Sequence, residues 1–410
     1  MTADRCPMTD FDHNSQAHSD DPVASYDAVR AATPVAWAQA SGGYWVLSSY
    51  EAVFDAARDD DLFTSSRTPS GGEGLSVVIP KTPMHFHIPI EVDPPQFRQY
   101  RKVVNLITAP AAVARMNGMI DRYVTLFIDD VIERGECDFA DVIGVPAAVT
   151  IDWLGLPIDS WPRYASAHRA TLASEVGSAE YRQAVEVDLP LLSAQMTETI
   201  ARRRAKPCDD ALSFLLDQQI DGRPITDDEV FSMTELLIAG GTGTTASLVG
   251  QTLVWLNEHQ DVRRKLIDDP SLLDRAIEEF LRFFAPTQAL ARTVTHDAEF
   301  HGCSLRRGDR VLMAWASANR DPSFFQHADE LDIERWPNRH VAFGVGVHRC
   351  AGSHLARAMS RSLLSQILER MPDYAVDVAA LEPYPRQGVN VGFRCIPATF
   401  TPGARRMPNP

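Results

Sequence analysis

One cysteine near the C-terminal end stands in surroundings that suit a thiolate bound to a metal. Cys350 lies in the segment 343–352, FGVGVHRCAG. A thiolate on iron needs backbone N–H groups around its sulfur, and Gly344 and Gly346 let the chain bend close enough to offer them. Apolar residues at helical spacing follow, so Cys350 is expected just before a helix N-terminus, whose dipole favours a negative sulfur. With Phe343 shielding the sulfur from water, the pattern predicts an axial ligand to haem iron.

Two other roles for Cys350 are less well supported. An isolated cysteine in a globular protein is usually buried and structural. The aromatic residue, glycines and basic residue around this one favour a ligand instead. A zinc site needs four ligands, and His348 and Cys350 have no second pair nearby at the usual spacing.

The loop has the form F-G-x-G-x-H-x-C-x-G, and it resembles the haem-binding signature of the cytochrome P450 superfamily. Three further elements occur in the family's order, so the resemblance extends from about residue 21 to residue 400. It implies haem b (heme b, iron protoporphyrin IX) as the cofactor, with Cys350 as the ligand of the metal. The cofactor-binding residues that it implies are Arg101, Leu236, Gly240, Thr244, Arg292, Phe343, Gly344, His348, Cys350 and Ala351.

The first further element is a charged pair, Glu279 and Arg282, in a helix predicted over 273–284. The i, i+3 spacing places both charges on one helix face. Such a pair alone is usually a solvated salt bridge of little energy. The resemblance implies instead a buried triad with Arg335 from a later loop. This triad would hold the cysteine loop in place and take no part in the chemistry.

The second element is a long helix predicted over 226–260, which opens with a capping box at Thr226 and Glu229. It would be about 50 Å long. Its middle, AGGTGTT over 239–245, holds three glycines and three threonines, although each glycine costs a helix roughly 1 kcal/mol. Small residues permit a close helix crossing or a bend. The resemblance implies that the helix widens over the haem, with Thr244 hydrogen-bonding dioxygen.

At this point the chain departs from the family, because most members place an acid directly before that threonine and this chain has Gly243. General acid catalysis needs a donor within hydrogen-bond reach or one water away. Thr242, Thr245, a carboxylate on the substrate and a water chain beside Gly243 are all open as replacements. Hydrogen peroxide, which brings its own protons, is open as the oxidant. The predicted catalytic residues are Thr244, Gly243 and Thr245.

The third element, beginning at Asp93-Pro94-Pro95, predicts a helix N-terminus and resembles the family's helix beside the haem. Phe97 stands where many bacterial members have histidine, so the chain looks like the camphor-hydroxylase branch. The resemblance implies that Arg101, Arg292 and His348 pair with the haem propionates. Arginine suits this task because its bonds to carboxylates are charge-assisted and can be bidentate.

The composition and the arrangement of these elements predict a single protein domain. The chain has 410 residues, 45% of them apolar and 23% charged. Elements far apart in sequence would meet at one haem, so residues 21–410 are predicted to form a single domain after a disordered tail over 1–20. The chain has no apolar run of transmembrane length, no signal-peptide pattern and no disulfide spacing, which predicts a cytoplasmic location. The net charge of −16 argues against nucleic acid or anionic membrane as a partner.

The predicted fold class is mainly α with small β-sheets, the haem lying between the long helix and the cysteine loop. Strands are predicted over 43–47 and 308–313, a helix over 50–58, and mostly helices over 110–270. The segment 65–92, rich in glycine, proline and serine, predicts a mobile surface loop. By the resemblance it covers an apolar pocket that suits a mid-sized hydrophobic molecule. The pocket candidates are His85, Phe86, His87, Ala239, Gln288, Ala289, Leu290 and Val389.

The predicted reaction is insertion of one oxygen atom from O2 into an organic substrate, with electrons from separate proteins. Five basic residues belong to segments expected on the cysteine side of the haem. They could dock an acidic ferredoxin, although scattered solvated cations explain them equally well. The alternatives are a peroxide-driven oxygenase and a non-catalytic haem sensor. The five basic residues are Arg98, Arg101, Lys102, Arg349 and Arg357.

Overall fold

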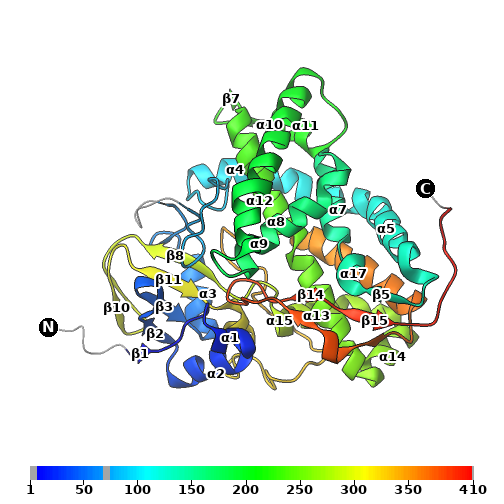
Figure 1. Ribbon diagram of the computed structural model, residues 1–410. Coiled ribbons are helices and arrows are strands. Elements are labelled where there is room, and N and C mark those ends of the chain that lie inside the picture. The colour runs from blue at the N-terminus through cyan, green and yellow to red at the C-terminus, as the bar shows by residue number, and fades with distance from the viewer. Residues whose placement is uncertain (1–6, 68–73, 409–410) are drawn as a thin grey trace.

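The computed structural model describes residues 7–67 and 74–408. Helices make up most of the molecule, and a sheet with the first three helices forms the side that carries the N-terminus (Figure 1). The helices are α1 (Gln16–Asp20), α2 (Pro22–Ala32), α3 (Tyr50–Arg58), α4 (Gln96–Thr108), α5 (Pro110–Ile132), α6 (Phe139–Val142), α7 (Val145–Leu154), α8 (Trp161–Ala173), α9 (Ala179–Arg182), α10 (Leu189–Ala205), α11 (Ala211–Leu216), α12 (Asp227–Thr242), α13 (Thr244–Glu258), α14 (Gln260–Asp268), α15 (Leu273–Phe284), α16 (Trp315–Asn319) and α17 (Ser353–Arg370).

The main sheet has six strands in the order β1-β2-β3-β11-β8-β4. Val311 of β11 pairs with Trp45 of β3 on one side and with Arg292 of β8 on the other, so the sheet positions Arg292. The strands of this sheet are β1 (Met8–Thr9), β2 (Val35–Ala38), β3 (Tyr44–Leu47), β4 (Phe63–Thr64), β8 (Leu290–Val294) and β11 (Arg310–Met313).

Smaller sheets complete the β-structure. One has three strands in the order β12-β15-β5, and three are two-stranded: β13-β14, β10-β9 and β6-β7. Their strands are β5 (Glu136–Asp138), β6 (Gln219–Ile220), β7 (Arg223–Pro224), β9 (Ala298–Phe300), β10 (Cys303–Leu305), β12 (Ala375–Val376), β13 (Glu382–Pro383), β14 (Phe393–Cys395) and β15 (Pro397–Thr399).

The core brings the predicted elements together around the centre of the helical part. One apolar cluster joins α5, α13, α15 and α17, and Phe343 of the cysteine loop and Ala246 of α13 both pack against it. A second cluster joins α4, α8, α10 and α12, and Val347, Ala351 and Leu237 pack against that one. The cysteine loop and the central helix therefore share both cores. The predicted fold class is confirmed.

The predicted long helix is interrupted. The capping box at Thr226 and Glu229 is present and starts α12, but α12 ends at Thr242 and α13 begins at Thr244. Gly243 between them has φ −112° and ψ −43°. The long central helix is therefore present with a break at its centre, in the glycine-rich segment that lowers helix propensity and for which a bend was one of the expectations.

The N-terminal prediction also differs from the structure. Residues 1–6 lie outside the described residues, but the rest of the expected disordered tail is ordered. β1 pairs with β2, and Phe11 packs against Tyr26 at 5.4 Å between ring centroids. His13 is fully buried and hydrogen-bonds the Tyr44 hydroxyl at 3.0 Å. These few aromatic anchors order a segment whose acidic composition predicts disorder.

The prediction of a mobile surface loop over 65–92 is wrong for the residues that the structure describes. Residues 68–73 lie outside the described residues. Leu75, Val77 and Val78 form a small buried cluster beside the main sheet. Glu91 is 1% exposed and accepts hydrogen bonds from Arg67. The glycines and prolines here shape a packed, irregular segment, which periodicity cannot reveal.

No single helix in the described ranges is long and apolar enough to cross a bilayer. The pair α4 and α5, bent by 43° at the break between them, passes the test of length and composition when its members are taken together.

Candidate active site

The cysteine loop folds as a tight bend immediately before α17. The backbone N–H of Cys350 donates to the carbonyl of Phe343 at 2.8 Å, which closes the loop. Gly344 and Gly346 have φ of +65° and +74°, a backbone conformation that favours glycine. A Cβ at Gly346 would also collide with the carbonyl oxygen of Ala57 in α3. Both glycines are thus required by the bend that presents Cys350.

The Cys350 side chain is accessible to solvent, although the protein atoms around it desolvate the thiol, which is the largest influence on its pKa and raises it. The N–H of Gly352 and the charges of Arg101, Arg349 and Arg357 act in the opposite direction. A thiol held among N–H groups and cations is suited to bind a metal as the thiolate.

Cationic and polar side chains converge near the same loop. His348 is close enough to Arg101 and Arg292 for both charges to lower its pKa, after the larger effect of burial. Its Nε2 is buried and has no hydrogen-bond partner among the residues that the structure describes. Arg292 is 5% exposed, and burial lowers its pKa to about 10. The buried Arg292, the half-buried Arg101 and the unpaired Nε2 of His348 are suited to bind the carboxylates of a haem.

The three charged residues expected to form a triad lie together. Glu279 and Arg282 are fully buried. Arg282 donates two hydrogen bonds to the Glu279 carboxylate at 2.7 and 2.8 Å, and Arg335 donates to both of its oxygens at 3.1 Å. Arg282 also donates to carbonyl oxygens of the segment before the cysteine loop, at Asn319 and Ala328. The cluster therefore ties α15 to the chain that leads into the loop.

A stripe of small and accessible residues runs along the centre of α12 and α13. The spacing of three and four residues places its members on one helix face. Thr244 is partly exposed in this stripe, and its hydroxyl donates to the Gly240 carbonyl at 3.0 Å. Thr245, the other predicted catalytic threonine, is 3% exposed and lies on a different face. The stripe consists of Leu236, Ala239, Gly240, Gly243 and Thr244.

The three pocket candidates before α4 point in different directions. His85 is exposed, and its Nε2 lies 3.4 Å from the Ser193 hydroxyl of α10. Phe86 is 40% exposed and lies under the guanidinium of Arg67. Only His87 points inward: it is 2% exposed, and its Nε2 has no hydrogen-bond partner in the described part of the chain.

The remaining pocket candidates before and after β8 differ in how far their side chains are exposed. Leu290 and Val389 are partly exposed and pack on the same small cluster. Gln288 is 4% exposed, and its side-chain amide donates to the carbonyls of Phe284 and Ala285. Ala289 is 1% exposed. Gln288 and Ala289 are thus buried, because this segment is drawn inward as it enters β8, and their place in the pocket stays a prediction.

Sequence reasoning missed two buried polar residues near the central helix. Glu235 of α12 is 2% exposed and His168 of α8 is 3% exposed, with 3.9 Å between the Glu235 carboxylate and His168 Nε2. In the sequence, each of the two occupies a position in a helix that an exposed polar residue could equally occupy. Their separation of 67 residues in sequence gives no signal that they meet, so only the tertiary structure reveals the pair.

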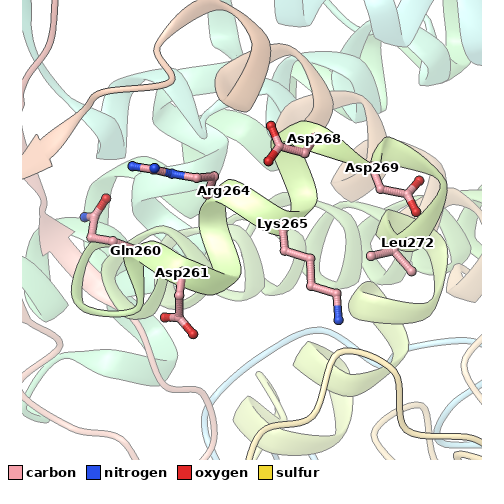
Figure 2. A pocket seen from close by; sticks show the side chains of 7 residues that line it. All are labelled: Gln260, Asp261, Arg264, Lys265, Asp268, Asp269 and Leu272. Atoms are coloured by element: carbon pink, nitrogen blue, oxygen red, sulfur yellow. The ribbon is translucent and has the colours of Figure 1, made fainter.

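One prominent surface cavity lies away from this site. A cavity of about 650 Å³ lies over α14 and is lined mainly by charged side chains, shown in Figure 2. It is remote in sequence from the cysteine loop and contains no cysteine or histidine. Its lining residues are Gln260, Asp261, Arg264, Lys265, Asp268, Asp269 and Leu272. The chemistry of the donor set, and not cavity size, locates the candidate active site.

Comparison with known proteins identifies the family. The signature described as Cytochrome P450 matches residues 192–372. The steroid C26-monooxygenase of Mycolicibacterium smegmatis is 35% identical and covers 93% of each chain. Cytochrome P450 130 of Mycobacterium tuberculosis is 30% identical over 86% of this chain and 88% of that protein. The structure of a Mycobacterium marinum cytochrome P450 in complex with pseudoionone matches with a TM-score of 0.87 at 26% identity, covering 97% of this chain and 100% of that chain.

The chain belongs to the cytochrome P450 family. Members of this family bind haem b through a cysteine thiolate, so the predicted cofactor is confirmed. The protein is a haem-thiolate monooxygenase, an oxidoreductase that incorporates molecular oxygen. Family members use dioxygen, a hydrophobic substrate and electrons from a redox partner.

Proposed function

We propose that the protein hydroxylates a mid-sized hydrophobic molecule of the steroid or terpenoid type, with Cys350 as the ligand of the haem iron. The observation that carries the proposal is the accessible Cys350 thiol in a closed, glycine-bent loop. The substrate class draws on relatives named as steroid C26-monooxygenase and vitamin D(3) 25-hydroxylase, the latter 31% identical. The partly exposed apolar side chains of Leu236, Leu290 and Val389 suit such a molecule.

The side chains around the site would each have a defined task. Arg101, Arg292 and His348 would hold the haem carboxylates, and Phe343 would keep water from the sulfur. Bound haem supplies the activation of dioxygen and the transfer of one oxygen atom to the substrate. Thr244 would hold a proton at its hydroxyl oxygen, which the Gly240 carbonyl already orients. Thr242 adds a second buried hydroxyl without a hydrogen-bond partner among the described residues.

The electron donor would be a separate ferredoxin that docks on the cysteine side. A groove of about 510 Å³ along α4 is lined by Arg98, Arg101 and Lys102 among others. Arg349 is exposed. Arg357 differs from these four, because it donates to both oxygens of Glu278 at 2.5 and 2.7 Å and is only 28% exposed. The docking face would therefore rest on the first four cations. The cytoplasmic location and the single domain over 21–410 stay predictions.

The test is turnover with purified haem-loaded protein, a bacterial ferredoxin and its reductase, isotopically labelled dioxygen and a panel of steroids and linear terpenoids. Incorporation of one labelled oxygen atom per product supports the proposal. Turnover with hydrogen peroxide alone at higher rates would favour the peroxide-driven alternative, which Gly243 keeps open. Haem uptake without oxidation under either supply would point to a sensor. Lys102→Glu should slow reduction by ferredoxin in a salt-dependent way and leave reduction by dithionite unchanged.

A further inference from the structure

Three buried titratable side chains from three separate elements meet beside the central helix. His87 comes from the segment before α4, His168 from α8 and Glu235 from α12, and each is at most 3% exposed. The 3.9 Å between His168 Nε2 and the Glu235 carboxylate exceeds a hydrogen bond. His87 is close enough to His168 for its charge to influence the pKa of His168. The three form a buried polar cluster in which ring nitrogens of both histidines have no hydrogen-bond partner among the described residues.

The missing partners make this cluster unusual for a protein interior. Neither ring nitrogen of His168 has a hydrogen-bond partner within the described ranges, and the same holds for Nε2 of His87. Leaving a buried polar group unpaired costs about 1–3 kcal/mol. Nearly all such groups in native proteins have a partner, so an unpaired group calls for an explanation such as a ligand or an ordered water.

Two members of the cluster, Glu235 and His168, lie one helical turn from apolar residues of the candidate substrate pocket. Glu235 is one helical turn from Ala239 on the same face of α12, and Ala239 belongs to the accessible stripe. His168 is likewise one turn from Leu172 on α8. Leu172 packs on the same small cluster as Leu290 and Val389. The polar groups thus lie at one end of an otherwise apolar lining, away from the Thr244 end of the stripe.

The charge state of the cluster limits what it can bind. Burial raises the pKa of Glu235 to about 7 and lowers the pKa of His168 to about 3. Burial also lowers the pKa of His87 to about 4, against the opposing effect of Glu91 and with the effect of Arg67 and His85. At neutral pH both imidazoles are uncharged and the Glu235 carboxyl is present in protonated and ionised forms. A neutral imidazole and a protonated carboxyl each donate and accept hydrogen bonds. They match a neutral oxygen better than an ion, which would lose its hydration without a counter-charge.

We propose that His87, His168 and Glu235 bind a neutral oxygen-bearing group, a ketone or hydroxyl, at the end of the substrate far from the site of oxidation. The inference rests on the proposed function and adds the chemical feature that would orient the substrate. An apolar pocket fixes orientation through a few placed polar groups. A site built to hydrogen-bond an oxygen rejects the analogue that lacks it, because its own buried groups are then left unpaired.

The test compares matched ligands by the shift of the haem absorption band on binding, without turnover. One pair is a steroid ketone and the same steroid with a methylene in place of the ketone. The second pair is pseudoionone and its hydrocarbon analogue. The native protein should bind at least one ketone roughly tenfold tighter than its hydrocarbon partner. Glu235→Leu and His168→Phe should reduce that ratio to about one.

Two further variants separate recognition from folding. Glu235→Gln keeps the size and donates an N–H, so it should retain the preference for the ketone. Leu172→Ala, the matched apolar control, should weaken both members of a pair equally. The carbon monoxide spectrum of each variant reports whether the haem site is intact. A native protein without preference, or a preference that survives in both Glu235→Leu and His168→Phe, overturns the proposal.

Failure of this inference differs from failure of the proposed function. Equal binding of both members of each pair leaves the substrate class intact and removes only the role of the cluster. If no member of either pair shifts the band while the haem is thiolate-bound, the substrate class is wrong and the proposed recognition falls with it.

Discussion

The hydroxyl of Thr244 donates to the carbonyl of Gly240 at 3.0 Å, at the point where α12 ends and α13 begins. In an unbroken helix that carbonyl would accept the backbone N–H four residues later. Threonines inside unbroken helices make the same side-chain bond, as Thr150 does to Pro146 and Thr252 to Leu248, so the bond fixes where the Thr244 hydroxyl lies and does not depend on the break at Gly243. The contact between the Thr244 hydroxyl and the Gly240 carbonyl therefore places the group that we expect to hold a proton.

Replacing Thr244 with alanine should uncouple electron delivery from oxidation. The variant loses the hydroxyl that we expect to hold a proton near dioxygen. Product formed per electron should fall on the order of a hundredfold, the lower end of the range for loss of a proton-transfer group, and hydrogen peroxide should accumulate. Thr245→Ala is the control, because Thr245 is buried on another face. Equal losses in both variants would contradict the role given to Thr244.

Introducing an acid directly before Thr244 should increase the yield of the reaction with dioxygen. Gly243 has a negative φ, and nothing lies within 4 Å of where a Cβ would be, so Gly243→Asp fits without a clash. We expect more product per electron with dioxygen, because a carboxyl can pass protons to Thr244. Product and peroxide release are measured together. An unchanged ratio would mean that protons already arrive by an efficient route.

Neutralising Glu279 should destabilise the fold without altering the chemistry directly. The Glu279→Gln variant leaves the fully buried Arg282 without its counter-charge. Breaking a buried pair in this way costs about 3–5 kcal/mol. The midpoint of urea unfolding and the retention of haem should both fall. Glu334→Gln is the control, since the Glu334 side chain is 48% exposed in its pair with Lys265 and should cost about 1 kcal/mol or less.

The ion pair between Glu278 and Arg357 should make the stability of the folded protein fall as the pH is lowered. Burial alone would raise the Glu278 pKa, but hydrogen bonds from Arg357 and His340 outweigh it and hold that pKa at about 2, below its ordinary value of 4.5. A lowered carboxyl pKa stabilises the folded state above pH 4.5, and this contribution is lost as the pH falls towards 2. Glu278→Gln should therefore show a flatter decline of unfolding midpoint below pH 5. Parallel pH curves for the two proteins would contradict this.

The sequence predicts helices and strands correctly where its pattern indicates only one kind of secondary structure. The helix over 273–284, the helix over 50–58 and the strands at 43–47 and 308–313 match α15, α3, β3 and β11. These segments have strong periodicity or clear caps. The long helix could not be placed fully, because glycine and threonine at 239–245 fit both a bend and a straight helix. The ordered residues 7–20 depend on aromatic contacts with distant segments, which composition does not report.

The site was predictable to the same degree. The cysteine loop carries its chemistry in consecutive residues, so its bend could be inferred from Gly344 and Gly346 alone. Which histidine of 85–87 points inward could not be inferred, since it depends on the irregular backbone there. The pair of His168 and Glu235 was missed because its members come from different helices.

The most direct test of the central claim is the absorption spectrum of the dithionite-reduced protein under carbon monoxide, recorded beside Cys350→Ala and Cys208→Ala. Cys208 is an exposed cysteine away from the loop and serves as the control. The account predicts a strongly red-shifted Soret band in the native protein and in Cys208→Ala, and its disappearance in Cys350→Ala. A band that persists without Cys350, or a native spectrum typical of histidine-ligated haem, would contradict the assignment of Cys350 as the ligand.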